Sequence, residues 1–223
     1  QATAERTAQY LLLLQDRDTS SSSYGSIRGG PNASWYSTAD NIIAYFFLRD
    51  LGRLTQNDTY RQAAELIKFS LMEHHWEEAQ GRFFPTVGDS SKGLVETNSL
   101  GALFLISIDE IAKTRRGLDF VENNYFTSAA GPVSGYAPYE NHTTVWPQAS
   151  LQMALAYKRV GNAKKSNIII QEIIKLQDSE GGIPYAMPKA ELETGEVFHE
   201  WPSVAGTAWL TVALSDNGRF LGP

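Results

Sequence analysis

The chain has 223 residues, of which 42% are hydrophobic and 20% charged, the composition of a globular protein with a sizeable core rather than of a disordered chain. Its formal net charge of −6 argues against a nucleic-acid partner or an anionic membrane surface, because the basic residues are scattered and form no patch. Cysteine is absent, so disulfides, a thiol nucleophile and thiolate metal ligands are excluded.

The apolar periodicity of the first 60 residues predicts one amphipathic and one buried helix. The first helix is predicted over residues 4–15, with Thr3 as its N-cap. A loop rich in serine and glycine follows over residues 18–31. A strongly apolar helix is then predicted over residues 38–51, ending near Gly52.

The next segment repeats this alternation. Either Asn57 or Asp58 can cap an amphipathic helix over residues 59–75, whose charged side chains fall on one face. Residues 82–87 are predicted to be extended, and a second apolar helix is predicted over residues 97–108.

The C-terminal part of the chain contains the remaining helices. Helical potential continues past a break near Gly117 to Tyr125. An apolar helix over residues 145–157 precedes a polar-faced helix over residues 162–176. The last helix, again apolar, is predicted to begin at Pro202, because proline is favoured in the first turn.

Amphipathic helices, which must face water, therefore alternate with apolar helices, which must be buried. Early positions of the apolar helices recur about 50 to 60 residues apart, the period of a helical-hairpin repeat, at Asp40, Asn98, Gln148 and Val204. Buried helices in an inner ring and amphipathic helices in an outer ring make an α/α toroid. We therefore predict an all-α toroid of about four hairpins in a single domain over residues 1–223. With so few hairpins the ring can be incomplete or open. In such a fold the loops before the inner helices gather at one end and form one cleft.

Several stretches resemble the six-hairpin glycosidase-like α/α toroids. The resemblance rests on four of them in order, namely Ser37-Thr38-Ala39-Asp40-Asn41, Val145-Trp146 with its helix, Gly181-Gly182-Ile183-Pro184-Tyr185, and Pro202-Ser203-Val204-Ala205-Gly206-Thr207-Ala208-Trp209. It implies a glycoside hydrolase or polysaccharide lyase that acts in a cleft at one end of the barrel.

The chain departs from that superfamily in two ways. Toroids of this kind usually have six hairpins, so a chain with about four is a smaller open ring, a fragment, or a protein that assembles with others. Where similar proteins can carry a glutamate after the Val-Trp pair, this chain has Pro147 and Gln148, neither of which can act as an acid or base.

Glycoside hydrolysis generally needs two carboxyl groups, about 5 Å apart for retention or about 6.5–9.5 Å for inversion. Candidates at the expected cleft are Asp40, Glu96, Glu140 and Glu200, with Glu200, Asp40 and Glu96 preferred as catalytic residues. Asp40 and Glu96 could equally serve helix starts, where a carboxylate is favoured by the helix dipole. Glu200 is preferred because desolvation by the neighbouring Trp201 would raise its pKa toward that of a general acid.

Aromatic residues at the loop ends could stack on the apolar faces of sugar rings, or they could fill the core. The expected substrate-binding residues are Trp35, Tyr36, Asn98, Tyr136, Tyr139, Trp146, Gln148, His199 and Trp201. The histidines lack metal-ligand spacing and no phosphate-binding glycine loop is present, so no metal and no cofactor are predicted.

Two functions remain open from the sequence. The first is a glycoside hydrolase, with a lyase that uses Tyr136 or His199 as its base as a lesser variant. The second is a non-catalytic glycan-binding or surface-assembly protein on the same scaffold. Carbohydrate is the expected partner in both, and nucleic acid is not.

The location of the protein is predicted from weaker signals. Apolar runs are too short to span a bilayer, so membrane insertion is not expected. The sequons at Asn32, Asn57 and Asn141 favour an extracellular, cell-surface or periplasmic glycoprotein. Self-association is expected to complete or cover an open ring.

Overall fold

The computed structural model describes residues 1–128, 131, 133–192, 195–215 and 221–222. They fall into two compact units: unit 1 comprises residues 1–79 and 83–91, and unit 2 comprises residues 80–82 and 92–223. The single domain over residues 1–223 stays a prediction.

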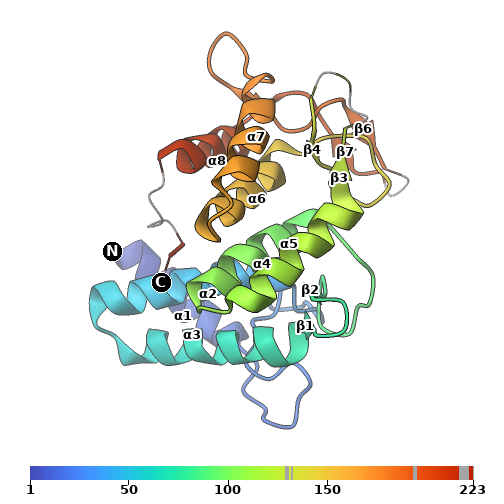
Figure 1. Cartoon of the computed structure of the whole chain (residues 1–223). Coiled ribbons are helices and arrows are strands. Elements are labelled where there is room, and N and C mark those ends of the chain that lie inside the picture. Colours follow the sequence, from blue (N-terminus) through green and yellow to red (C-terminus); the bar gives the residue numbers. More distant parts are fainter. Residues whose placement is uncertain (129–130, 132, 193–194, 216–220, 223) are drawn as a thin grey trace. The chain divides into compact units, whose positions relative to one another are not determined.

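Unit 1 is built on a helical hairpin of α2 (Thr38–Thr55) and α3 (Asp58–Ser70), with α1 (Ala2–Leu14) packed on α2 (Figure 1). The π-helical turn η1 (Leu71–His75) extends α3 and leads into β1 (Trp76–Glu77). The core of the unit is made of aliphatic side chains from α2, α3 and η1 that have no exposure, Ile42, Leu48, Ile67 and Leu71.

Side-chain caps explain where these helices begin. The Ser37 hydroxyl accepts from the Asp40 amide at the start of α2, and the Asn57 side chain accepts from the Thr59 amide at the start of α3. Asn41 also ties α2 to the preceding loop, because its side chain exchanges hydrogen bonds of 2.7 and 3.0 Å with the Ile27 backbone.

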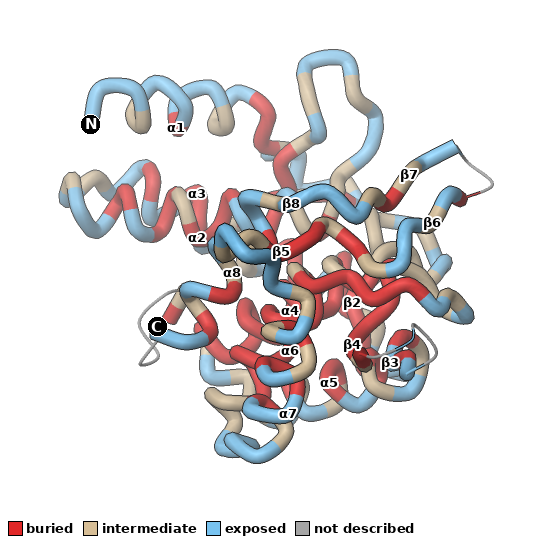
Figure 2. Tube along the Cα trace, turned by 90° about the horizontal axis from the view of Figure 1, so that it is seen from above, coloured by how far each residue is buried: buried red, intermediate tan, exposed pale blue. Residues whose placement is uncertain are grey.

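Unit 2 contains two further hairpins, α4 (Val95–Ser107) with α5 (Ile111–Tyr125) and α6 (Pro147–Arg159) with α7 (Ala163–Ile174). The last helix, α8 (Val204–Ser215), packs on α6 and α7 (Figure 1). Both α4 and α6 are buried along nearly their whole length, as the red stretches of Figure 2 show. A buried hydrogen bond of 2.6 Å from Ser99 to Gln152 joins them.

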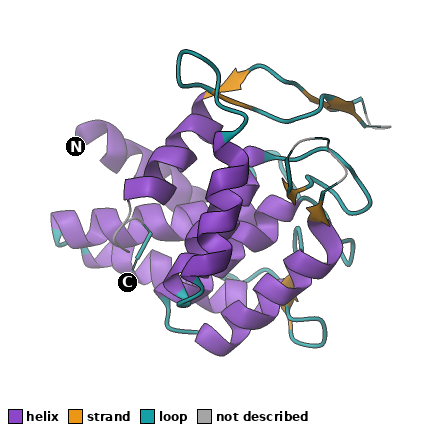
Figure 3. Cartoon of the chain, turned by 45° about the horizontal axis from the view of Figure 1, so that its top comes forward, coloured by secondary structure: helices purple, strands orange, loops and turns teal. Residues whose placement is uncertain are grey.

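Strands of two residues lie in the connections between the helices (Figure 3). In unit 2, β3 (Phe126–Thr127) pairs with β4 (Gly135–Tyr136), and β6 (Ala190–Glu191) pairs with β7 (Val197–Phe198). The pair of β5 (Ile183–Pro184) and β8 (Pro202–Ser203) holds the chain just before α8. The remaining strand, β2 (Arg82–Phe83), lies where the chain passes from one unit to the other.

The all-α class and the alternation of helices are confirmed, with three exceptions. The predicted break near Gly117 is wrong, because α5 runs through this buried glycine from Ile111 to Tyr125. The last helix begins at Val204 rather than at Pro202, because Pro202 and Ser203 are taken up by pairing with β5.

The third exception is the burial of α8. Its sequence is as apolar as that of α4, yet only Gly206, Leu210 and Ala213 are buried. An apolar helix is buried only where another element covers it, and the described residues cover one side of α8. Within the described residues, no helix is both long and apolar enough to cross a membrane.

Candidate functional site

Extended segments of unit 2 meet before α6 and α8 and fix the side chains of the candidate site. The Trp146 amide donates to the Tyr136 carbonyl at 2.8 Å, and Val145 and Met187 exchange two backbone hydrogen bonds of 2.7 and 3.0 Å. The Ala186 amide donates to the His199 carbonyl at 2.9 Å. Residues far apart in the sequence are thereby held side by side.

Four aromatic side chains from these segments form what we term the aromatic cluster: Tyr139, Trp146, Tyr185 and Phe198. Tyr185 and Phe198 stack with ring centroids 5.4 Å apart and an angle of 7° between the rings. The Trp146 ring meets both edge-on, at 6.0 and 5.6 Å. Phe198 is fully buried whereas Tyr139 and Tyr185 are partly exposed, so the cluster presents its tyrosines to solvent.

Glu96 and Gln148 meet although 52 residues separate them. Glu96 lies in the first turn of α4 and Gln148 in that of α6, and the Gln148 amide nitrogen donates to Glu96 Oε1. An amide nitrogen can only donate a hydrogen bond, so Gln148 orients the Glu96 carboxylate by bonding to one of the two carboxylate oxygens. Both side chains are partly exposed and can reach a ligand.

A second carboxylate, Glu196, lies at the tyrosines of the aromatic cluster. The Tyr139 hydroxyl donates to Glu196 Oε2 at 3.2 Å. Burial, followed by the charge of Glu196, raises the pKa of Tyr139 to about 12. Burial and then the charges of Glu196 and Glu96 raise the pKa of Tyr185 as well, so both phenols stay neutral donors at physiological pH.

The segment 199–201 presents a flat ring system to solvent. The His199 and Trp201 rings stack at 4.0 Å with 2° between them, and 69% of Trp201 is exposed. Residues 199 and 201 share one side of an extended chain, whereas Glu200 points to the other side. The expected burial of Glu200 against Trp201 is therefore wrong: Glu200 is exposed and accepts from the Lys189 amide at 2.9 Å.

Unit 1 carries three of the predicted site residues, Trp35, Tyr36 and Asp40. Trp35 is 48% exposed, and its ring lies so close to Gly29 that a Cβ added there would be 2.0 Å from a ring carbon. Tyr36 is partly exposed, and its backbone exchanges two hydrogen bonds with the Thr86 hydroxyl. Asp40 is exposed in the first turn of α2.

Several other predicted site residues, all in unit 2, are buried or paired with another side chain. Tyr136 has no exposure, its hydroxyl donates to Glu122 at 2.6 Å, and burial raises its pKa far above the ordinary value. It is therefore a packing residue and unsuited to be the base of a lyase. Asn98 is buried in α4, and only 3% of Trp146 is exposed. Glu140 is paired with Lys92.

Sequence reasoning missed three residues of this site: Tyr185, Glu196 and Phe198. The candidates came from four stretches that lead into the apolar helices, residues 35–40, 96–98, 136–148 and 199–201, and none of the three lies in one of them. Tyr185 closes the Gly-Gly-Ile-Pro-Tyr stretch, and Phe198 directly precedes the selected His199, so a search for aromatic residues in loops would have found both.

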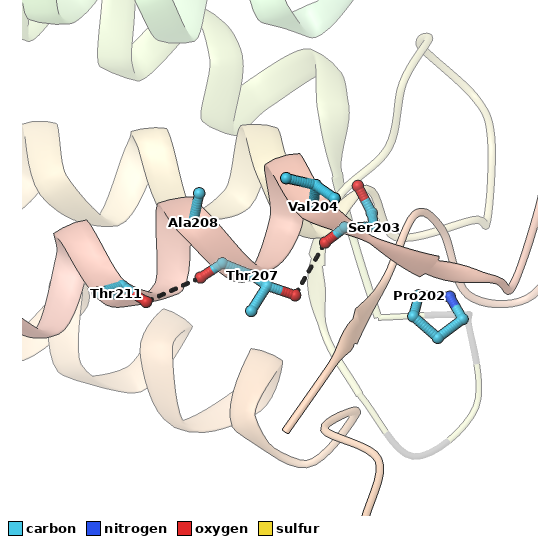
Figure 4. Close-up of a pocket in the computed structure, with 6 residues that line it drawn as sticks. All are labelled: Pro202, Ser203, Val204, Thr207, Ala208 and Thr211. Atoms are coloured by element: carbon cyan, nitrogen blue, oxygen red, sulfur yellow. Dashed lines mark hydrogen bonds between the residues drawn. The ribbon is translucent and has the colours of Figure 1, made fainter. Parts of the chain in front are cut away.

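An apolar groove of about 420 Å³ runs along the exposed side of α8 and β8, lined by Pro202, Ser203, Val204, Thr207, Ala208 and Thr211 (Figure 4). The Thr207 and Thr211 hydroxyls donate to carbonyls one turn earlier, at 2.8 and 3.1 Å. Both hydroxyl protons are thus used within the chain, and Thr207 Oγ1 also accepts from the Ile183 amide at 3.0 Å, so the groove holds little polar functionality for a ligand. Among the described residues, no group of three or more acidic or histidine side chains could hold a metal ion.

No protein-family profile and no curated protein sequence matches the chain. Solved structures do match. A possible member of the GH105 family from Salmonella enterica is 13% identical with a TM-score of 0.67 over 95% of this chain and 64% of its own. A family 105 glycoside hydrolase from C. acetobutylicum is 14% identical with a TM-score of 0.62 over 94% of this chain and 63% of its own.

A third match is an unsaturated glucuronyl hydrolase variant with the saccharide dGlcA-Glc-Rha-Glc. It is 14% identical, with a TM-score of 0.70 over 99% of this chain and 68% of its own. The chain thus spans about two thirds of the length of these three solved chains.

Proposed function

Because the chain has the fold of the six-hairpin glycosidase-like α/α toroids, we propose that it is a carbohydrate-active hydrolase or a part of one. The observation that carries the proposal is the Glu96–Gln148 pair beside the aromatic cluster. A sugar ring has apolar C–H faces that suit the exposed tyrosines and hydroxyl groups that suit a carboxylate. The candidate site offers both kinds of contact.

Glu96 takes the role of acid or base in this proposal. It is partly exposed beside the aromatic cluster, and Gln148 holds one of its oxygens in place. As a partly exposed carboxylate it can exchange a proton with the glycosidic oxygen or with water. A second carboxylate is required, as nucleophile in a retaining reaction or as base for water in an inverting one; within unit 2 the candidate is Glu200, and Asp40 of unit 1 stays the prediction made from the sequence.

A reducing-end release assay over a polysaccharide panel tests the proposal with Glu96→Gln. The amide keeps an acceptor for Gln148 but cannot exchange a proton, so we expect activity to fall by about 10²–10⁴-fold. Glu110→Gln is the matched control, because Glu110 lies beyond the opposite end of α4. Full activity in Glu96→Gln would remove Glu96 from the reaction.

The same assay on variants of Glu200 and Asp40 identifies the second carboxylate. We therefore compare Glu200→Gln with Asp40→Asn, each of which removes the charge and keeps the side-chain length. Only the variant of the second carboxylate should lose activity to a similar degree.

A non-catalytic glycan-binding protein is the second candidate. The stacked His199–Trp201 pair and the half-exposed Trp35 favour it, because flat exposed rings are binding surfaces that need no acid or base. Saturable glycan binding without any release of reducing ends would support this function. Loss of the binding in Trp201→Ala would locate it at the exposed ring.

A further inference from the structure

The charge of the preferred sugar follows from the groups around the exposed tyrosines, and this inference rests on the proposed function. In the β6–β7 hairpin, Glu196 lies next to the exposed tyrosines. The neighbouring strand β7 sets the position of Glu196. Phe198, two residues on, is fully buried in the aromatic cluster, and the Glu196 carbonyl accepts from the Leu192 amide at 2.8 Å. The exposed side chain of Glu196 therefore lies beside the cluster rather than away in solvent.

Two carboxylates lie close to the tyrosines. Glu196 accepts from the Tyr139 hydroxyl at 3.2 Å, and Glu96 lies at the starts of α4 and α6 with Gln148. The charges of both carboxylates act on the Tyr185 hydroxyl. A ligand on the exposed face of Tyr185 therefore meets the negative charge of both carboxylates.

One lysine close to this region, Lys92, is already engaged. Lys92, which precedes α4, pairs with the Glu140 carboxylate and donates to Asn124 at 2.8 Å. His142 and His199 lie nearby, the first 6.0 Å from the Tyr139 ring. Neither histidine replaces the bidentate guanidinium that a protein typically uses to bind a carboxylate.

One polar group of the aromatic cluster, the indole N–H of Trp146, has no hydrogen-bond acceptor among the described residues. Trp146 is 97% buried and, among the described residues, no acceptor lies within hydrogen-bonding distance of its Nε1. Its ring meets Tyr185 and Phe198 edge-on. A buried donor without an acceptor is unfavourable, which distinguishes this ring from the others of the cluster.

We infer that the sugar residue held against Tyr139 and Tyr185 is uncharged, and that Glu196 and Glu96 select it. The hydroxyl groups of a neutral sugar can donate to both carboxylates while its C–H face lies on the Tyr185 ring. A uronic acid at the same place would bring a third negative charge within reach of two others and be repelled. Glu196 is then a specificity-determining residue.

The test compares glycans that differ only in charge. Oligogalacturonides and oligosaccharides containing glucuronic acid are each paired with their carboxyl-reduced neutral forms, and binding is measured by titration calorimetry at about pH 7.5, where carboxylates are ionised. We expect the neutral member of a pair to bind at least about tenfold more tightly, and the ratio to shrink as salt rises from about 50 to about 500 mM.

Variants of the hairpin assign the effect to Glu196. Glu196→Gln should reduce the neutral-to-charged ratio by about threefold or more, and Glu196→Lys should reduce it further by replacing repulsion with attraction. Glu191→Gln on the paired strand β6 is the matched control and should leave the ratio unchanged. Circular dichroism of each variant checks that the chain is folded.

The outcomes separate this inference from the proposed function. If the charged member of each pair binds as tightly as the neutral one or more tightly, the inference is wrong while a carbohydrate site stands. If no glycan of either kind binds, both fail. If the ratio is as expected but Glu196→Gln and Glu191→Gln behave alike, the role of Glu196 is wrong.

Discussion

At the scale of single residues, His75 in unit 1 has both ring nitrogens in hydrogen bonds and no exposure. Thr38 Oγ1 lies 2.7 Å from Nδ1, and Ser26 Oγ lies 2.9 Å from Nε2. Because the Thr38 hydroxyl donates to the Phe84 carbonyl, its oxygen accepts from Nδ1–H, and Nε2 accepts from Ser26. This arrangement requires the neutral ring and lowers the pKa of His75 to about 3, chiefly through burial and then through the charge of His74.

Acid should therefore destabilise unit 1 through His75. Its pKa is lower in the folded chain than in the unfolded chain, where it is about 6.5, so the unfolded state binds the extra proton first. The stability that the neutral ring contributes is present above pH 6.5 and is lost as the pH falls toward 3, by up to about 1.4 kcal/mol per pH unit. Urea unfolding at about pH 7.5 and at about pH 4.5 measures this loss of stability.

The control for the His75 prediction removes the titrating group. His75→Gln should be less stable at neutral pH by about 1–3 kcal/mol, because buried hydrogen bonds are lost, but its stability should depend less on pH. His142→Gln, at a partly exposed histidine, should keep the pH dependence of the original chain. Identical pH profiles for all three proteins would contradict the assignment.

Trp35 gives a second prediction at this scale. A Cβ at Gly29 would overlap the Trp35 ring, whereas a Cβ at Gly30 would meet nothing within 4 Å. Gly29→Ala should therefore displace the ring, shift its fluorescence, and weaken glycan binding by about fivefold if Trp35 stacks on a sugar. Gly30→Ala should change neither. A displaced ring with unchanged binding would exclude Trp35 from the binding surface.

At the scale of elements, α8 differs from α4 and α6 in how much of its apolar surface is covered. Leu210 is 4% exposed, whereas Val204 is 89% exposed in the same helix. Leu210→Ala should lower the free energy of unfolding by about 2–5 kcal/mol, because it leaves a cavity against the core of unit 2. Val204→Ser should change it by no more than about 0.5 kcal/mol. Denaturant unfolding of the two variants compares these costs directly.

A large loss of stability in Val204→Ser would show that the outer side of α8 is covered in solution. The exposed groove described above would then be occupied by another part of a folded assembly. Equal, small effects in both variants would mean that α8 is not docked on α6.

At the scale of the whole molecule, self-association stays a prediction. The exposed apolar residues of α8, such as Val204 and Leu214, and the groove beside them favour association with a second copy of the chain. We expect sedimentation velocity over a concentration series to detect a dimer, and Val204→Asp to shift the population toward monomer. Sedimentation as a monomer throughout the series would contradict the prediction.

Much of the fold could be predicted because helices leave a periodic record in the sequence. The apolar and amphipathic helices appear in the expected order, and Asn57 caps α3 as one of the two expected caps. The start of α8 was misjudged because Pro202 is compatible with both a helix start and an edge strand, and only pairing with β5 decides between them.

The candidate site was predicted less completely. Glu96 and Gln148 were both selected because each stands at the start of an apolar helix, and such starts meet at one end of a toroid. Tyr136 was selected as an aromatic residue at a loop end, yet it points into the core toward Glu122. The direction of a loop aromatic depends on packing, which has no simple sequence period.

The sequence by itself determined the helices, their alternation and the toroid fold, because these follow from local hydrophobic patterns and from the spacing of repeats. Tertiary structure alone decided that Glu96 meets Gln148, that Tyr185 stacks on Phe198, and that one side of α8 stays exposed. These are contacts between segments distant in the chain. Their geometry depends on how helices and extended segments pack, which no single stretch of sequence specifies.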